Sequence, residues 1–263
     1  VQPIGKFACS DERLNKIWEI SARTLKLCME DSFTDCPLYE QTLWVGDARN
    51  EGQFAYTTFD AVDLAKRCAK LTAYSLDEYP MALCQVPTTW EIILPAWSFL
   101  WVQTVLEHWL WSGEREFLQQ IYPAVARTLR NCRQQLSDWR GLLSIKAWNF
   151  FDWAGIDYNH RVVTHNQILL AHAYQCGARL AQELGKKRDA QWMLKQREDL
   201  IAAINTHLWS KEKQAYIDAI DDGGVPSANA SQQVNVLALL YGVAQGRRAQ
   251  TLRRLLDRPD PGM

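Results

Sequence analysis

The sequence lacks an excess of charge of either sign. Lys and Arg number 29 and Asp and Glu number 30, which gives a formal net charge of −1. Proteins that bind nucleic acids or anionic membranes through their surfaces carry a clear excess of positive charge. We therefore expect neither kind of partner.

The sequence also lacks a signal-peptide pattern at its start and any apolar run long enough to cross a bilayer. None of the seven cysteines forms a C-x-x-C pair, so no zinc site is predicted. Cys28, Cys68, Cys132 and Cys176 occur in apolar helical patterns, where free cysteine behaves as a small hydrophobe. The odd number of thiols favours a reducing compartment, and we expect a cytoplasmic protein that needs no metal and no cofactor.

Tryptophan is the residue in excess, with twelve copies in 263 residues. So many indole rings are typical of clefts that bind carbohydrate, where a ring face packs on a sugar. The chain has the length of one large domain or two small ones. It begins at Val1 rather than at an initiator methionine, and its last residues, 258–263, do not read as a domain end. We expect a piece of a longer protein.

Apolar residues recur at helical spacing through most of the chain. Ser10 is predicted to cap the first helix, whose apolar stripe runs from Leu14 through Ile17 and Trp18 to Cys28, and Asp60 to cap the third. Pro95 either kinks the helix that contains it or marks its first turn. The predicted helices cover residues 10–28, 47–57, 60–74, 90–111, 114–136, 165–184, 187–208, 229–243 and 246–256.

Three long loops, at 32–46, 77–89 and 139–163, separate these helices. The segment 215–222 alternates too briefly to predict more than a small strand, and no sheet is expected from it. Helices joined alternately by short and long loops favour an all-α fold of paired helices in a toroid, an (α/α) barrel. A helical solenoid is the alternative, but the sequence shows no repeating period. In the barrel the long loops would collect at one end and form the site.

The segment 35–47 contains the residues best suited to chemistry. Asp35, Glu40 and Asp47 supply three carboxylates, and Trp44 stands between the last two. Pro37 favours a loop for the first half. One carboxyl group can donate a proton to a glycosidic oxygen while the others hold sugar hydroxyls and the indole packs on the ring. Taken alone, Asp47 is also typical of a helix cap and the other acids of a solvated loop.

This segment resembles the catalytic motif of the bacterial α-L-rhamnosidases of glycoside hydrolase family 78, through Asp-Cys-Pro, Glu40 and Trp-x-Gly-Asp. Three later segments are similar to that family as well: the aromatic helix 90–113 followed by Glu114, the run 121–125, and Phe151-Asp152-Trp153. The resemblance covers most of the chain. It implies one domain over residues 1–263, an (α/α)6 barrel that is incomplete at its C-terminal end, and flanking β-sandwich domains in the full-length protein.

The resemblance also implies roles for single residues. Glu40 would be the general acid in an inverting hydrolysis of terminal α-L-rhamnosides. Asp35 and Asp47 would bind rhamnose hydroxyls, and Trp44 would form an apolar wall. Asp152 and Trp153 would add substrate contacts from the second loop.

Two departures from the family pattern matter. Many members carry arginine directly before the glutamate, where this chain has Tyr39. Inversion also needs a second carboxylate about 6.5–9.5 Å from the acid, and its family position would fall beyond Met263.

The other candidates for a base within the chain are weak. Glu91 could serve, although an acid near a helix start is more typical of an interaction with the helix dipole. Asp157 and His165 are further candidates, with His165 more typical of a cap, and His108 is expected in the core or a groove wall. Two other functions remain open: another (α/α)6 glycosidase with a different sugar, and a catalytically incomplete sugar-binding fragment.

Overall fold

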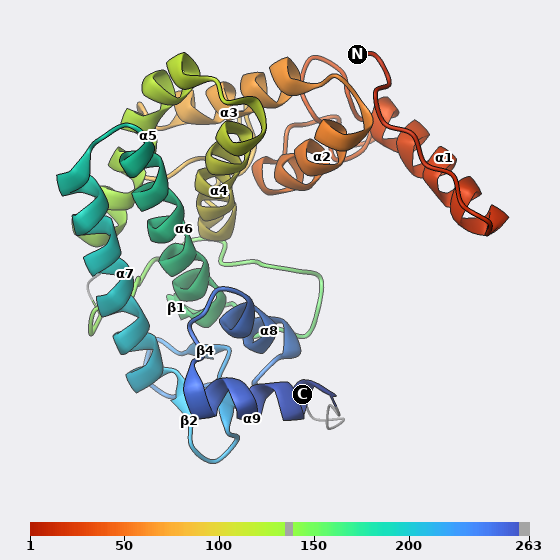
Figure 1. Cartoon of the computed structure of the whole chain (residues 1–263). Helices are drawn as coiled ribbons and strands as arrows, with labels where there is room; N and C mark the ends of the chain where they lie inside the picture. The colour runs from red at the N-terminus through yellow and green to blue at the C-terminus, as the bar shows by residue number, and fades with distance from the viewer. Residues whose placement is uncertain (135–138, 258–263) are drawn as a thin grey trace.

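The computed structural model describes residues 1–134 and 139–257. Within these ranges nine helices follow one another around an arc, from α1 at one end to α9 at the other (Figure 1). The helices are α1 (Glu12–Leu27), α2 (Val45–Thr58), α3 (Val62–Ser75), α4 (Pro95–Ser112), α5 (Arg115–Gln134), α6 (Thr164–Glu183), α7 (Lys187–His207), α8 (Gln232–Leu240) and α9 (Gly246–Asp257). Residues 135–136 of the predicted fifth helix lie outside the described ranges.

Two central helices carry most of the packing. α4 is buried on nearly all sides and packs against α2, α3, α5 and α6. α6 is buried even more completely and packs against α4, α5, α7 and α8. A helix that is apolar around most of its circumference needs neighbours on every side, so the sequence of α4 favours a central position.

Proline and glycine set the ends of α4. Pro95 occupies the first turn, where its missing N–H costs no intrahelical hydrogen bond. Gly113 ends the helix with a φ of 66°, in the left-handed region that glycine adopts without strain. Of the two roles predicted for Pro95, the first-turn role is therefore confirmed.

The first helix differs from the prediction. Its N-cap is Asp11, which accepts a hydrogen bond from the Arg13 N–H at 2.9 Å, rather than Ser10. Of its apolar stripe, Leu14 and Ile17 are 47% and 57% exposed. α1 projects from the rest of the molecule and packs mainly against α2 (Figure 1). Periodicity identified the helix, but only tertiary contact decides whether an apolar face is buried.

Two smaller predictions are also wrong. Asp60 does not cap α3, because the N-cap residue is Ala61 and no side chain bonds to the free N–H groups. The segment 215–222 does take part in sheets, since β3 (Ala215–Tyr216) pairs with β2 (Trp209–Ser210) and β4 (Ala219–Ile220) with β1 (Val162–Val163), all antiparallel. Both pairs are two residues long. The β1–β4 pair fastens the loop after α7 to the start of α6, and the β2–β3 pair is a hairpin within that loop.

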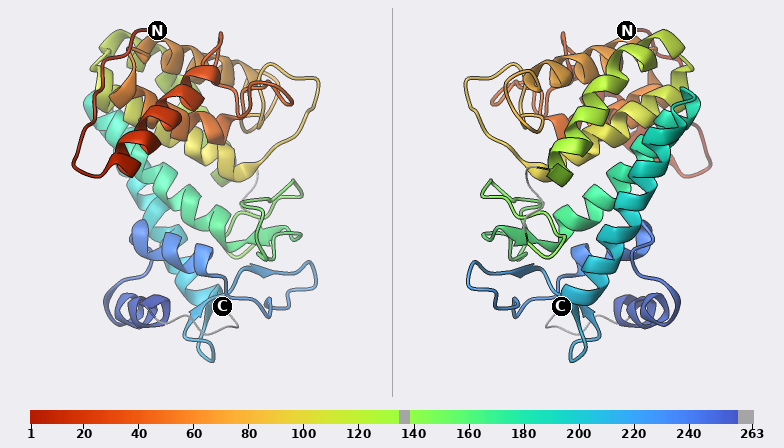
Figure 2. Two further views of the ribbon diagram at one scale, coloured as in Figure 1. Left: turned by 90° about the vertical axis from the view of Figure 1, so that its right-hand side faces the viewer. Right: turned by 90° about the vertical axis from the view of Figure 1, so that its left-hand side faces the viewer.

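The long connections lie on one side of the helices, as the barrel interpretation predicted (Figure 2). Loop 77–89 meets loop 32–46 at an isolated β-bridge between Gln85 and Trp44. It meets loop 139–163 in an apolar cluster of Cys84, Leu94 and Phe150. Contacts between the loops therefore hold this end of the fold in one arrangement.

Candidate active site

A pocket of about 500 Å³ opens at the loop end of the helices. It brings together all six of the predicted site residues: Asp35, Glu40, Trp44, Asp47, Asp152 and Trp153. Its other lining residues come from α2, from the start of α4, from loop 139–163, from α6 and from α8: Gly46, Arg49, Asn50, Leu94, Trp97, Leu100, Trp148, Phe150, Phe151, Leu169, Leu237 and Tyr241.

Glu40 lies on the exposed part of loop 32–46, and the indole of Trp44 holds its carboxylate. Trp44 Nε1 donates a hydrogen bond to Glu40 Oε2 at 2.5 Å. Residues 40 and 44 do not lie on one helix, because α2 begins at Val45. The loop itself therefore produces the contact, and Trp44 both lines the pocket and orients the acid.

Asp35 and Asp47 lie deeper than Glu40, and both are partly buried. Burial and, next, a hydrogen bond shared with the side chain of Glu40 together raise the pKa of Asp35 to about 6. Burial also raises the pKa of Asp47, with an added contribution from the charge of Glu40. A partly buried carboxyl group beside other carboxylates retains its proton more readily than an isolated one. We call Asp35, Glu40 and Asp47 the acidic wall.

Glu51 supports the acidic wall from behind and was missed in the sequence. It follows Asp47 by four residues on α2, so the two side chains share a helix face. Burial and, to a smaller extent, the charges of Asp47 and Asp35 together raise the pKa of Glu51 to about 8. At neutral pH this carboxyl group is therefore largely protonated. In the sequence, the spacing of four residues between Asp47 and Glu51 was the signal that could have identified Glu51.

Gly46 allows the acidic wall to approach α4. A Cβ atom at this position would lie 2.5 Å from Cδ2 of Trp97. Any larger residue would push the start of α2 away from the indole. The glycine in the Trp-x-Gly-Asp run is thus required by packing between two helices.

Another part of the lining consists of aromatic rings, and we call Trp97, Trp148, Phe150 and Trp153 the aromatic wall. Phe150 is its centre, with ring centroids 6.1 Å from Trp97, 5.2 Å from Trp148 and 4.8 Å from Trp153. Trp148 also meets Trp44 edge-on at 6.5 Å, which joins the two walls. Trp153 is 84% exposed at the outer end.

Asp152 stands beside this wall, and its Oδ1 accepts a hydrogen bond from the Trp153 N–H at 2.7 Å. Asp152 and Trp153 come from loop 139–163, far in sequence from Glu40, yet they line the same pocket. Their proposed substrate contacts stay predictions.

The four other candidates for a base do not line the pocket. Glu91 is exposed and precedes the first residue of α4, so its predicted interaction with the helix dipole is wrong. Asp157 accepts a hydrogen bond from Ser227 and pairs with His160, and it belongs to the loop scaffold.

The two histidines are core residues. His165 is fully buried beneath Phe151, and burial lowers its pKa to about 3. It does not cap α6, whose N-cap is Val163. His108 is also buried, as predicted, with a pKa lowered to about 4 by burial and with Nδ1 3.0 Å from the Tyr56 hydroxyl.

Within the described ranges, no group of three or more His, Cys, Asp or Glu side chains is arranged to hold a metal ion. The same ranges contain no helix that is both long and apolar enough to cross a membrane.

Known proteins resemble this chain in both sequence and fold. A family model described as the bacterial α-L-rhamnosidase six-hairpin glycosidase domain matches residues 2–259. The chain belongs to this family. The family and the (α/α)6 fold class expected from the sequence are thus confirmed.

Solved rhamnosidases have the same fold. A family 78 rhamnosidase from Bacillus sp. GL1 is 41% identical with a TM-score of 0.94, covering 98% of this chain and 27% of that one. A rhamnosidase from Klebsiella oxytoca, solved with rhamnose bound, is 21% identical with a TM-score of 0.79, covering 100% of this chain and 50% of that one.

A curated α-L-rhamnosidase from Formosa agariphila is 22% identical over 90% of this chain and 28% of its own length. The chain therefore spans about a quarter of the curated relative and of the Bacillus enzyme.

Proposed function

We propose that this chain carries the acid side of an inverting α-L-rhamnosidase, which removes terminal α-L-rhamnose from glycosides. The observation that supports this most directly is the position of Glu40. Its carboxylate is held by Trp44 Nε1 at 2.5 Å, at the outer part of a pocket whose inner part contains Asp35 and Asp47.

Glu40 is suited to protonate the leaving oxygen. It lies on the exposed loop, where the glycosidic bond of a terminal sugar and its leaving group would pass. Its neighbour Asp35 has a pKa raised to about 6 by burial and by the side chain of Glu40, so a proton can be held next to Glu40 at weakly acidic pH. A general acid must start the reaction with that proton in place.

The rest of the pocket suits a deoxy sugar. Asp35 and Asp47 offer acceptors for hydroxyl groups. Leu94, Trp97 and Trp44 offer an apolar surface for the C6 methyl group that distinguishes rhamnose from a hexose with a C6 hydroxyl. Asp152 and Trp153, at the outer end, would contact the leaving group.

Inversion also requires a general base on the far face of the sugar. The expectation that this carboxylate lies beyond Met263 stays a prediction, as do the flanking β-sandwich domains.

A panel of chromogenic glycosides tests the proposal on the longest natural form of the protein that contains this chain. We expect hydrolysis of the aryl α-L-rhamnoside and at most weak hydrolysis of the α-D-glucoside, α-D-mannoside and uronide. Proton NMR of the early product should show the β-anomer of L-rhamnose. Preferred cleavage of a sugar with a C6 hydroxyl would refute the substrate, and initial release of the α-anomer would refute inversion.

A further inference from the structure

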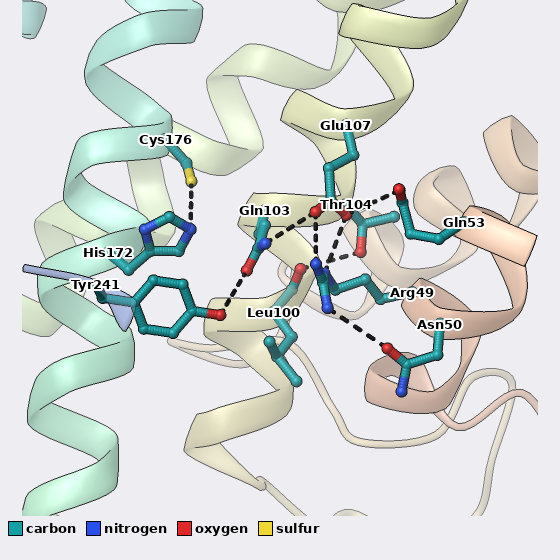
Figure 3. A network of polar contacts seen from close by, with 10 residues as sticks. All are labelled: Arg49, Asn50, Gln53, Leu100, Gln103, Thr104, Glu107, His172, Cys176 and Tyr241. Carbon is teal, nitrogen blue, oxygen red and sulfur yellow. Dashed lines mark hydrogen bonds and ion pairs between the residues drawn. The ribbon is translucent and has the colours of Figure 1, made fainter. Parts of the chain in front are cut away.

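Arg49 and Asn50 form a part of the pocket that neither the motif nor the roles above explain. Both residues follow Asp47 on α2, and both line the same pocket as the acidic wall. Figure 3 shows Arg49 at the centre of a polar network that reaches from α2 to α4, α6 and the end of α8.

Glu107 on α4 holds the Arg49 guanidinium in one orientation. Arg49 Nε donates to Glu107 Oε2 at 3.0 Å, and Nη2 donates to Oε1 at 2.6 Å. This two-point contact leaves little rotational freedom to the guanidinium plane. Glu107 is fixed in turn by the side-chain amides of Gln53, at 3.1 Å, and Gln103, at 2.8 Å.

The network continues to the opposite side of the pocket. The Tyr241 hydroxyl donates to Gln103 Oε1 at 3.4 Å, and the Tyr241 ring stacks on His172 with centroids 3.9 Å apart. Burial, and next the positive charge of Arg49, lower the pKa of His172 to about 4. The imidazole is therefore neutral at neutral pH and does not repel the guanidinium.

Arg49 and Asn50, which line the pocket, keep donors that this network does not use. Arg49 Nη1 donates a long hydrogen bond of 3.4 Å to Asn50 Oδ1. A guanidinium has five N–H donors, so the three bonds of Arg49 leave two for a ligand. Asn50 is exposed, and its amide nitrogen can donate as well. Because Glu107 balances the charge of Arg49, the site favours neutral oxygen acceptors over anions.

We propose that Arg49 and Asn50 form a donor pair that binds hydroxyl oxygens of the terminal sugar, and that this pair contributes to sugar specificity. The inference rests on the function proposed above. A sugar hydroxyl can donate to a carboxylate and accept from a guanidinium at the same time, so the donor pair complements the acceptors of the acidic wall.

Exposure indicates which part of the substrate the donor pair contacts. The Arg49 side chain is 22% exposed, whereas Glu40 lies on an exposed loop. The leaving group of a terminal glycoside lies on the outer side of the acid, and the terminal sugar on the inner side. By this criterion Arg49 belongs with the sugar, and the exposed Asn50 lies next to it on α2.

The experiment compares Arg49→Met with the wild type in the longest natural form of the protein. Methionine keeps the apolar stem and removes every donor. We expect the Kd for free L-rhamnose, measured by calorimetry, to rise about tenfold or more, since a lost hydrogen bond from a charged donor has an effect of this size. The kcat/KM values for an aryl rhamnoside and for a rhamnosyl disaccharide should fall by the same factor. For Asn50→Ala we expect a rise of about threefold in Kd.

Two further variants separate binding from folding. Arg49→Met leaves Glu107 without its cation, so Arg49→Met with Glu107→Gln serves as a second variant that leaves no unpaired carboxylate. The matched control is Arg130→Met, which breaks a 2.7 Å ion pair with Asp189 away from the pocket. Its rhamnose affinity should equal that of the wild type.

Three outcomes would contradict the donor pair or the function on which it rests. Unchanged rhamnose affinity in a folded Arg49→Met or double variant overturns the donor pair. A loss confined to the disaccharide places Arg49 against the leaving group and also overturns it. Failure of the wild type to bind rhamnose and to cleave the aryl rhamnoside refutes the proposed function, and with it this inference, before any variant is compared.

Discussion

The acidic wall and the aromatic wall enclose one pocket but are built in different ways. Asp35, Glu40 and Asp47 come from one continuous segment, and their contacts with one another are local. The aromatic wall joins Trp97 at the start of α4 to rings from loop 139–163. The acidic wall supplies groups that gain or lose protons, and the aromatic wall supplies shape. Substitutions in the acidic wall should therefore affect proton transfer, and substitutions that disturb the aromatic wall should affect packing and shape.

The largest effect is expected from removing the proton donor of the acidic wall. Glu40→Gln keeps the shape of the side chain, and its amide can turn so that the carbonyl oxygen still accepts the hydrogen bond from Trp44 Nε1. The amide cannot protonate the leaving oxygen. We expect kcat for an aryl α-L-rhamnoside to fall by about a thousandfold or more. The affinity for L-rhamnose should stay measurable by calorimetry. Glu116→Gln, at an exposed position of α5, is the control. Normal turnover in Glu40→Gln would show that another group is the acid.

The next effect tests the contact between the two walls. Gly46→Ala places a methyl group 2.5 Å from the Trp97 ring, so α2 or the indole must move. We expect a loss of about 1–3 kcal/mol in the free energy of unfolding, measured with denaturant. Gly155→Ala is a matched control, because a Cβ at that position has no neighbour within 4 Å. Equal stability of both variants would mean that the walls are not tightly packed.

A smaller effect concerns the support of the acidic wall by Glu51. The pKa of this group is about 8 in the folded protein against 4.5 ordinarily. The folded state thus retains a proton that the unfolded state releases, and the free energy of unfolding falls as pH rises from about 4.5 to about 8. Glutamine mimics the protonated form. We expect Glu51→Gln to be more stable than the wild type by about 1–2 kcal/mol at pH 8, with little difference at pH 4.5.

Denaturant titrations of both proteins at several pH values measure this difference. Burial is the main cause of the raised pKa, so the gain should depend on pH. A gain that is the same at every pH would point to packing rather than to ionisation. Glu116→Gln, at an exposed position, serves again as the control.

The smallest effect is expected at the outer end of the aromatic wall. Trp153 is 84% exposed, so Trp153→Ala should change the free energy of unfolding by less than about 0.5 kcal/mol. The KM for a rhamnoside with a large leaving group should rise by a few-fold, and the KM for a small one should not. Trp90→Ala, 58% exposed and outside the pocket lining, is the control. An equal rise for both substrates would place Trp153 against the sugar instead.

Local sequence signals predicted much of this molecule. The helical segments were found with ends a few residues off, and Pro95 was correctly offered as a first-turn residue because its ring restricts it to few places. The acidic segment was found because its side chains need only short-range geometry to meet. Caps were less predictable: Asp11 and Ala61 took positions assigned to their neighbours, since capping depends on small differences in backbone angle.

The residues that the sequence did not reveal depend on distant partners. The role of Arg49 requires Glu107, Gln103 and Tyr241, which belong to other helices. The exposure of the apolar face of α1 depends on which helices pack against it. The periodicity of its own sequence carries no information about those neighbours.

The family, the helical elements and the position of the acid-bearing segment could be read from the residues alone, because each depends on residues close together along the chain. The tertiary structure decided which aromatic rings face that segment, that Glu51 retains its proton behind Asp47, and that Arg49 is held toward the pocket. These features arise from burial and from contacts between helices. Both are properties of the packed chain rather than of any one segment.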